Sequence, residues 1–447
     1  MAATAANQDR HTRWNFIVIV LDASFFGAGL AFLDPVAVLP VLIEKLSGSE
    51  VVVGLMSALQ RAGWIVPQLL GASIVLHRPR KKPFVVYPCL LGRLPFLALA
   101  IFLCMPGARA HLQAVLLLLI AAFTTFFFAD GLIGVPWHDI IARTIPSGLR
   151  GRFFGSIQFL GGLLAIGSGW VVHRVLADPT IPFPQNYGRL FVLLFICMAI
   201  STFFLALIRE PRSSAVAERH SLSRIIRAIP STFRRSPLLL RVIVVQNICG
   251  IAGLALPFYA VYANVRLFLP AHTGGIFIWA AIVGSVLASI VWAYLNDRHG
   301  CVWVIRAVAC LVVGVPLTAL VVPPLVRALG VESAMAYVYA VVFLLNGATW
   351  GGMWMGFTNY VLELAPDDVR PLFLGLNATL AAPTILMPVL GGALLGVMSY
   401  EVLFTLVVVA GVAAVIYSHR LPTPRALPPA TPGADPDLRT PGPELRP

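Results

Sequence analysis

Five charged side chains lie inside long apolar stretches of the chain, where charge is unusual. They are Asp22, Asp34, Arg61, Arg93 and Asp130. A charge in a hydrocarbon environment costs a few kcal/mol or more, so such residues normally face other protein groups or water. All three acids belong to the first half of the chain, whereas the second half has only amides in comparable places. If the chain couples any process to protons, the titrating group is therefore expected in the first half.

The apolar stretches themselves have the length of membrane-spanning helices. Of the 447 residues, 59% are hydrophobic and 11% are charged, and the mean hydropathy is +0.87. A soluble protein of this size needs more charge to cover its surface. Apolar stretches of about 18 residues or more can cross a hydrocarbon core about 30 Å thick as helices. Twelve such spans are predicted, at 15–40, 51–76, 83–106, 112–141, 152–176, 188–208, 240–263, 274–295, 302–323, 335–363, 371–396 and 400–418.

The positive charge of the chain is distributed unevenly over the two sides of this predicted bundle. When successive loops are assigned to alternate sides, 24 of the 32 Lys and Arg residues fall on the side of both termini, and six fall on the other. Positively charged loops stay in the cytoplasm, so both termini are predicted there. The net charge of +13 is explained by this orientation, and the lipid bilayer rather than nucleic acid is the expected partner.

No arrangement of residues in the sequence is typical of an enzyme. There is no HExxH motif, no phosphate-binding glycine loop and no nucleophile elbow. The six cysteines are scattered singly, without the spacing of a metal or redox site, and are interpreted as buried apolar-like thiols. We therefore expect no catalytic residue, no metal site and no cofactor. Any uphill transport must draw on an ion gradient or on a partner.

A repeat divides the chain into two halves. Residues 137–155 align without a gap with residues 357–375, at a spacing of 220. Four residue types recur at equivalent positions: Pro146 and Pro366, Arg150 and Arg370, Phe153 and Phe373, and Gly155 and Gly375. At a fifth position, Asp139 aligns with Asn359. Each copy is a short basic turn between two predicted spans. The order of span, basic turn and span indicates an internal duplication.

The domain limits follow from the spans and this repeat. A cytoplasmic segment is expected at 1–14, two six-helix bundles at 15–208 and 240–418, and a cytoplasmic linker at 209–239. The segment 419–447 is rich in proline and poor in apolar residues, so it is predicted to be a disordered cytoplasmic tail. The fold class is therefore all-α and integral to the membrane, with two pseudo-symmetric bundles.

This plan resembles the major facilitator superfamily of secondary transporters. The local match is AYLNDRHG at 293–300, which is similar to the Asp-Arg-x-Gly turn of that family. The resemblance implies that Asp297 caps or pairs with neighbouring helix ends, and that Arg298 and Gly300 shape the turn. The equivalent turn of the first half departs from the pattern, since His77 replaces the acid and Arg80 replaces the glycine.

The resemblance also implies a central cavity lined by spans one, four, seven and ten. Asp22 and Asp130 would face this cavity at similar height. One of two nearby carboxylates in a medium of low dielectric constant tends to keep its proton, which suits a proton carrier. Helix packing by a neutral or hydrogen-bonded acid is the alternative for both. A polar belt and apolar walls would complete the site, from Asn247, Asn346, Phe126, Trp350 and Trp354.

The remaining charges are assigned to gating or packing. Asp34 and Arg61 lie outward of centre on adjacent spans and are predicted to form a structural or gating ion pair, with direct substrate contact as the alternative. Arg93 is expected to pack between helices. Asp139, together with Arg150 and Arg370 of the repeated turn, is interpreted as a hinge and latch element at the cytoplasmic face.

Our hypothesis is a monomeric proton-coupled transporter in the bacterial inner membrane that exports a lipophilic or amphipathic small molecule. The Gly-Pro-x-x-Gly-Gly pattern of many proton-coupled drug exporters is missing from span five, although Pro388-x-x-Gly391-Gly392 occurs in span eleven. Uptake of a polar nutrient by proton symport remains an alternative. A membrane sensor or scaffold without transport activity is the second alternative.

Overall fold

The computed structural model describes residues 2–75, 80–146, 149–210, 237–365 and 370–424, and within them the fold is entirely helical. The first half of the chain contributes six long helices, together with the short helix α2 and the 3-10 turn η1. The long helices are α1 (Ala2–Phe32), α3 (Glu50–Val75), α4 (Pro83–Cys104), α5 (Leu112–Thr144), α6 (Arg150–Ala177) and α7 (Gln185–Ala206). The short elements are α2 (Leu39–Ser47) and η1 (Ala108–His111).

The second half repeats this arrangement with two interrupted helices. Its continuous helices are α11 (Thr273–His299), α12 (Cys301–Ala328), α13 (Met335–Leu364) and α16 (Tyr400–Ser418), and the turn η4 (Glu332–Ala334) precedes α13. The first interrupted helix consists of α9 (Pro237–Gly250), η3 (Ile251–Leu254) and α10 (Phe258–Val265). The second consists of α14 (Arg370–Ala381), η5 (Ala382–Leu386) and α15 (Met387–Leu395).

Eleven helical segments of the described part are long and apolar enough to cross a membrane, which makes the chain a multi-pass membrane protein. They correspond to eleven of the twelve expected spans. The exception is α3, where the second span is expected, so the count of twelve stays a prediction. The helix α1 begins at Ala2 and thus covers the polar segment expected to precede the first span. Most of the expected linker (211–236) and tail (425–447), and also His77, lie outside the described residues.

Prolines and glycines explain where the helices end or break. The helix α1 ends at Phe32, just before Asp34-Pro35, because a residue that precedes proline avoids helical geometry. Pro257 follows η3 and Pro383 lies within η5, and neither residue can donate the backbone hydrogen bond of a regular helix. Gly300 has φ of 89°, a conformation that L side chains rarely adopt, which allows the sharp turn between α11 and α12.

Each half is held together by close contacts between helix backbones. In the second half, a Cβ atom added at Gly284 of α11 would lie 1.9 Å from the carbonyl oxygen of Leu344 on α13. The reciprocal contact joins Gly347 of α13 with the carbonyl oxygen of Ala281 at 2.0 Å. In the first half, Gly131 of α5 packs on the backbone of α3 in the same way. Small residues therefore set the helix spacing, as is common in membrane proteins.

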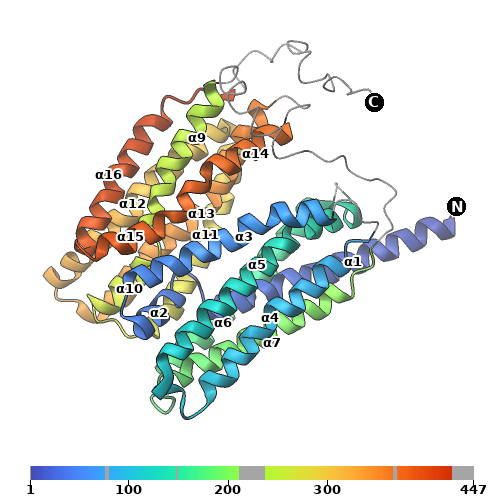
Figure 1. Cartoon of the computed structure of the whole chain (residues 1–447). Coiled ribbons are helices and arrows are strands. Elements are labelled where there is room, and N and C mark those ends of the chain that lie inside the picture. The colour runs from blue at the N-terminus through green and yellow to red at the C-terminus, as the bar shows by residue number, and fades with distance from the viewer. Residues whose placement is uncertain (1, 76–79, 147–148, 211–236, 366–369, 425–447) are drawn as a thin grey trace, which may run out of the picture.

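The two halves contact each other mainly through two helix pairs, α3 with α15 and α6 with α11. A Cβ atom at Gly54 of α3 would lie 2.1 Å from the carbonyl oxygen of Pro388, and one at Gly275 of α11 would lie 2.4 Å from that of Gly169. A smaller contact joins α2 with α10. Figure 1 shows the halves meeting near α2 and α10 and diverging toward the end where α1 begins and α16 ends. The halves are thus joined at one end.

Gly284→Ala is expected to destabilise the second half, because the new methyl group would overlap the backbone of α13. Overpacking of this kind costs about 1–3 kcal/mol, which should appear as a lower melting temperature of the purified protein. The matched control is Gly314→Ala on α12, where an added Cβ has no neighbour within 4 Å. Equal melting temperatures for the two variants would contradict the close approach of α11 and α13.

Candidate functional site

Asp22 on α1 is buried inside the first half, with 5% of its surface exposed. One carboxylate oxygen accepts a hydrogen bond of 2.6 Å from the hydroxyl of Ser201 on α7. The other accepts one of 3.3 Å from the indole N–H of Trp137 on α5. Asp22 therefore ties three helices of the same half together.

Arg93 on α4 lies beside this acid and is equally buried. Its guanidinium donates to the backbone carbonyl of Met198 and to the hydroxyl of Thr202, both on α7. Its central carbon lies 5.9 Å from the centre of the Phe26 ring on α1. The positive charge acts on the carboxylates of both Asp22 and Asp130. Arg93 thus interacts electrostatically with the buried Asp22 and with the half-buried Asp130.

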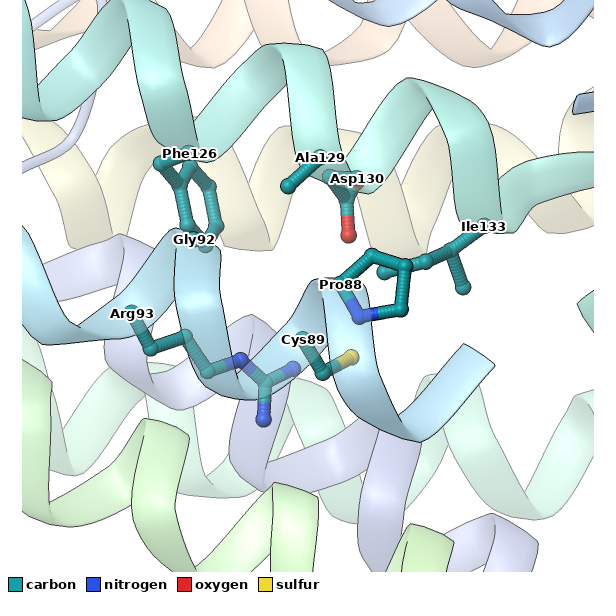
Figure 2. A pocket seen from close by; sticks show the side chains of 8 residues that line it. All are labelled: Pro88, Cys89, Gly92, Arg93, Phe126, Ala129, Asp130 and Ile133. Atoms are coloured by element: carbon teal, nitrogen blue, oxygen red, sulfur yellow. The ribbon is translucent and has the colours of Figure 1, made fainter. Parts of the chain in front are cut away.

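Asp130 on α5 borders a narrow recess between α4 and α5. Figure 2 shows its carboxylate directed toward Pro88 and Cys89 of α4, with the side chain of Arg93 on the far side of that helix. No water-sized sphere fits in the recess. The recess is lined by residues of these two helices alone: Pro88, Cys89, Gly92, Arg93, Phe126, Ala129, Asp130 and Ile133.

These positions differ from the central cavity in which we expected Asp22 and Asp130. Both acids face neighbouring helices of the first half, Asp22 toward α7 and α5 and Asp130 toward α4. Phe126, expected as a cavity wall, is 1% exposed, and its ring centre lies 4.9 Å from that of Phe96. Phe126 is therefore a core residue. The role of the two acids in coupling stays a prediction.

Sequence reasoning missed the hydroxyl and indole partners of this cluster. Ser201 and Thr202 are adjacent polar residues in an otherwise apolar helix, and each binds a different charged residue. Such a pair inside a predicted span has to face protein, because lipid would leave its hydroxyls unsatisfied. Two adjacent hydroxyl residues within the predicted span were therefore the sequence feature that could have revealed these contacts of α7.

Arg61 on α3 faces the second half and does not pair with Asp34. The centre of its guanidinium lies 5.4 Å from the centre of the Trp350 ring on α13. The carboxylate of Asp34 accepts from the backbone N–H groups of Val36 and Ala37, at 2.9 and 2.7 Å. Among the described residues, no ion pair joins Asp34 with Arg61. The expected pair is therefore wrong, because the turn at Asp34-Pro35 uses the carboxylate locally.

Two tryptophans on the same face of α13 are largely exposed. Trp350 is 62% exposed and contacts Arg61 of the other half. Trp354 follows four residues later, on the same side of the helix, and is 77% exposed. Their role as apolar walls of a cavity stays a prediction.

Amide side chains gather near the breaks of the two interrupted helices. Asn247 on α9 donates to the carbonyl of Leu380 on α14, at 3.1 Å. The side-chain oxygens of Gln246 and Asn377 are buried and have no hydrogen-bond partner in the described part of the chain. Asn346 on α13 is half-buried. Near these helix breaks, the second half thus has polar but uncharged side chains.

The repeated turn of the first half contains a buried ion pair. The ammonium of Lys81, which is 2% exposed, lies 2.6 Å from the carboxylate of Asp139 at the end of α5. Arg143 reaches the same carboxylate at 2.8 Å. Glu210 accepts from the backbone N–H of Lys81 at 2.7 Å. Arg150 donates to the carbonyls of Ala142 and Ile145 at the same helix end. These contacts fasten α4, α5 and the end of α7 within one half.

The equivalent turn of the second half has similar positions but different charges. At the spacing of 220 residues, Cys301 replaces Lys81 and Asn359 replaces Asp139. Asn359 donates to the side chain of Asn296 at 3.1 Å, and Cys301 donates to Glu363 at 3.5 Å. Near this turn, Asp297 accepts from the side chain of Asn296, and Arg298 donates to the hydroxyl of Tyr294. The side chain of Arg370 lies outside the described residues.

Two histidines lie at the end where the halves are joined. The ring of His173 on α6 contacts the backbone carbonyl of His272 at 3.0 Å, just before α11. The two ring centres are 4.9 Å apart. Nearby, the indole N–H of Trp279 donates to the carbonyl of Ile166 at 2.7 Å, which also crosses between the halves. Burial lowers the pKa of His272, and the neighbouring His173 lowers it further.

Solved structures with the same helix arrangement are transporters. A bacterial homologue of the iron transporter ferroportin, in an inward-facing state, matches with a TM-score of 0.68 and 14% identity, over 92% of this chain and 98% of that one. The nucleoside transporter NupG matches with 0.63 and 14%, and a D-xylose-proton symporter with 0.65 and 13%, both over 92% of this chain and 98% of theirs. No protein-family model and no curated protein matches the sequence.

The chain has the major facilitator fold. The match covers both halves, so the fold that the resemblance implied is confirmed, whereas the twelve spans and the cytoplasmic termini stay predictions. At 13–14% identity it shows the helix arrangement alone. The described residues include no group of three or more His, Cys, Asp or Glu side chains that could hold a metal ion.

Asp139→Asn is expected to destabilise the first half of this major facilitator fold by about 3–5 kcal/mol, because it leaves the buried Lys81 without its counter-charge. Adding Lys81→Met to this variant should restore most of the loss, as measured by thermal unfolding of the purified protein. Arg143→Gln is the matched control and should cost less than about 1 kcal/mol, since Arg143 is partly exposed. A double variant no more stable than Asp139→Asn would count against the pair.

Low pH is expected to weaken the contact between the two halves at the joined end. The pKa of His272 is lowered in the closed contact, so the open form binds a proton more readily. Closure is therefore favoured at high pH and lost as the pH falls through about 6.5, the ordinary histidine value. Spin labels on Ala177 and Phe268 should show a larger separated population at pH 5.5 than at pH 7.5.

His272→Asn tests this assignment, because it removes the titrating group and keeps the backbone carbonyl that contacts His173. The separated population should then stop depending on pH over this range. The exposed His111 offers the matched control, His111→Asn, which should behave like the unmodified protein. An unchanged pH dependence in His272→Asn would assign the effect to another group.

Proposed function

We propose that the chain is a secondary active transporter that moves a small molecule by alternating access of its two halves. The observation that carries the proposal is the asymmetric contact between the halves. Backbone contacts at Gly54 and Gly275 join them at one end, and they diverge toward the other (Figure 1). A site between two such bodies opens to one side of the membrane at a time when the bodies rock against each other.

We propose further that this conformation opens toward the cytoplasm. Two features support this. The structure resembles the inward-facing state of the ferroportin homologue, with a TM-score of 0.68, more than its outward-facing states, with 0.55 and 0.57. The diverging end also holds the start of α1 and the end of α16, and the uneven distribution of Lys and Arg along the sequence assigns that side to the cytoplasm of a bacterial inner membrane.

Proton coupling is proposed for the cluster of Asp22, Arg93 and Asp130. Two carboxylates share one buried guanidinium, so full ionisation of all three would leave a net negative charge inside the bundle. Binding one proton neutralises that charge. A change in the position of α4 relative to α1 and α5 would alter the distances among the three groups, and proton binding would then depend on the conformation.

The proposed cargo is a lipophilic or amphipathic compound that is exported. The exposed faces of Trp350 and Trp354 support this, since they offer apolar contact to a molecule between the halves. Uptake of a polar nutrient by proton symport is the second candidate. It is favoured by the buried amide oxygens of Gln246 and Asn377, which have no partner among the described residues and suit a solute with hydroxyl groups.

Asp22→Asn and Asp130→Asn are each expected to lower proton flux coupled to transport by at least about tenfold, since an amide binds no proton at neutral pH. The assay uses proteoliposomes with an internal pH dye. The added solute is the member of a compound panel that raises the melting temperature of the purified protein most.

The matched control is Glu332→Gln, which neutralises an exposed acid of η4 and should leave coupled flux unchanged. Melting temperatures of all variants separate loss of coupling from loss of folding. If both aspartate variants fold normally and keep coupled flux, the assignment of coupling to this cluster is wrong. If no solute drives flux in the unmodified protein, the result contradicts the proposed transport function.

A further inference from the structure

Arg61 is a cation on the inner face of one half that reaches into the other. It lies on α3, and its guanidinium covers the ring of Trp350 on α13 at 5.4 Å. One terminal nitrogen also lies near η3, 3.7 Å from the position that a Cβ atom of Gly253 would take. Arg61 of α3 therefore lies close to both η3 and α13 of the other half.

The positive charge of Arg61 has no acidic partner in the described part of the chain. The ion pairs found there join Lys81 and Arg143 with Asp139. The carboxylate of Asp34 is used by two backbone N–H groups, and those of Asp22 and Asp130 interact with Arg93.

A half-buried charge without a counter-charge is costly to desolvate and normally finds a partner. The contact with the Trp350 ring offsets part of that cost. Arg93 shows what full compensation looks like in the same protein, with two acids nearby and two hydrogen-bond acceptors on α7. A partner supplied from outside the chain would fill the same role for Arg61.

We infer that Arg61 is an anion-binding residue between the two halves, and that the cargo is an organic anion with an aromatic or apolar body. The planar guanidinium presents N–H groups in the geometry that a carboxylate, sulfonate or phosphate accepts in two parallel hydrogen bonds. The exposed ring of Trp350 lies beside it, and the exposed Trp354 follows one turn later on the same face of α13. Charge and apolar surface thus adjoin, which fits an amphipathic anion.

Naming this anion as cargo rests on the proposed function, whereas its binding does not. Binding is therefore measured directly, on the full-length protein in lipid nanodiscs, by isothermal titration calorimetry with empty nanodiscs subtracted. The probes share one aromatic body and differ in charge: 2-naphthoate, 2-naphthalenemethanol and 2-naphthylmethylammonium. We expect 2-naphthoate to bind at least about tenfold more tightly than the neutral and cationic probes.

Substitutions then locate the anion site. Arg61→Gln should weaken 2-naphthoate binding by about tenfold or more and leave the neutral probe unchanged, whereas Arg61→Lys should lose less, since it keeps the charge but not the fork. Trp350→Leu should weaken the binding of all three probes. The matched control is Arg174→Gln, because Arg174 also covers a tryptophan ring, Trp170, at 5.4 Å, but on α6 away from Arg61.

Two outcomes would overturn the inference. One is equal binding of the anionic and neutral probes by the unmodified protein, which needs no variant to fold. The other is wild-type affinity for 2-naphthoate in Arg61→Gln. If 2-naphthoate binds through Arg61 but no solute drives flux in proteoliposomes, the anion site stands and the proposed transport function fails.

Discussion

A charge buried among membrane helices has to be compensated by protein groups, because the surrounding lipid offers no partner. The first half of this protein is organised around that constraint. Arg93 on α4 binds α7 directly and interacts with acids on α1 and α5. Asp22 also binds α7, by accepting a hydrogen bond from the hydroxyl of Ser201. Four helices are thus fixed relative to one another by three charges, and any change in protonation changes the balance of forces among them.

In the described part of the second half, the same packing problem is solved without a buried charged side chain. Its helices approach through glycines, and its polar groups are amides and hydroxyls. The comparison of the repeated turns makes the point clearly, since Lys81 and Asp139 of the first half correspond to Cys301 and Asn359 of the second. The duplication has kept the geometry and changed the electrostatics. Proton binding by an acid within the membrane-spanning helices is therefore expected in the first half.

Much of the fold was predictable from the sequence, because hydropathy, turn prolines and the repeat at 220 residues depend on local patterns. The rotation of each helix about its axis was not. Depth in the membrane placed Asp22 and Asp130 at similar height, but α1 and α5 are apolar on all sides, so periodicity does not show which side faces the neighbouring helices. Because the rotation of α5 about its axis was unknown, Phe126 was predicted to be a cavity wall although its ring lies in the core.

The predicted pair of Asp34 and Arg61 failed for a related reason, and its failure is informative. Proximity of opposite charges in adjacent spans does not specify a pair when a turn can use the carboxylate, and the backbone N–H groups after Asp34-Pro35 do so. Two arginines in the first half therefore have contrasting surroundings. Arg93 is surrounded by acids and acceptors of its own half and stabilises the bundle. Arg61 has an aromatic ring of the other half and, among the described residues, no acid. A charge without an acidic partner where the two halves meet is available to a ligand, and a ligand bound there would favour the conformation in which both halves contact it.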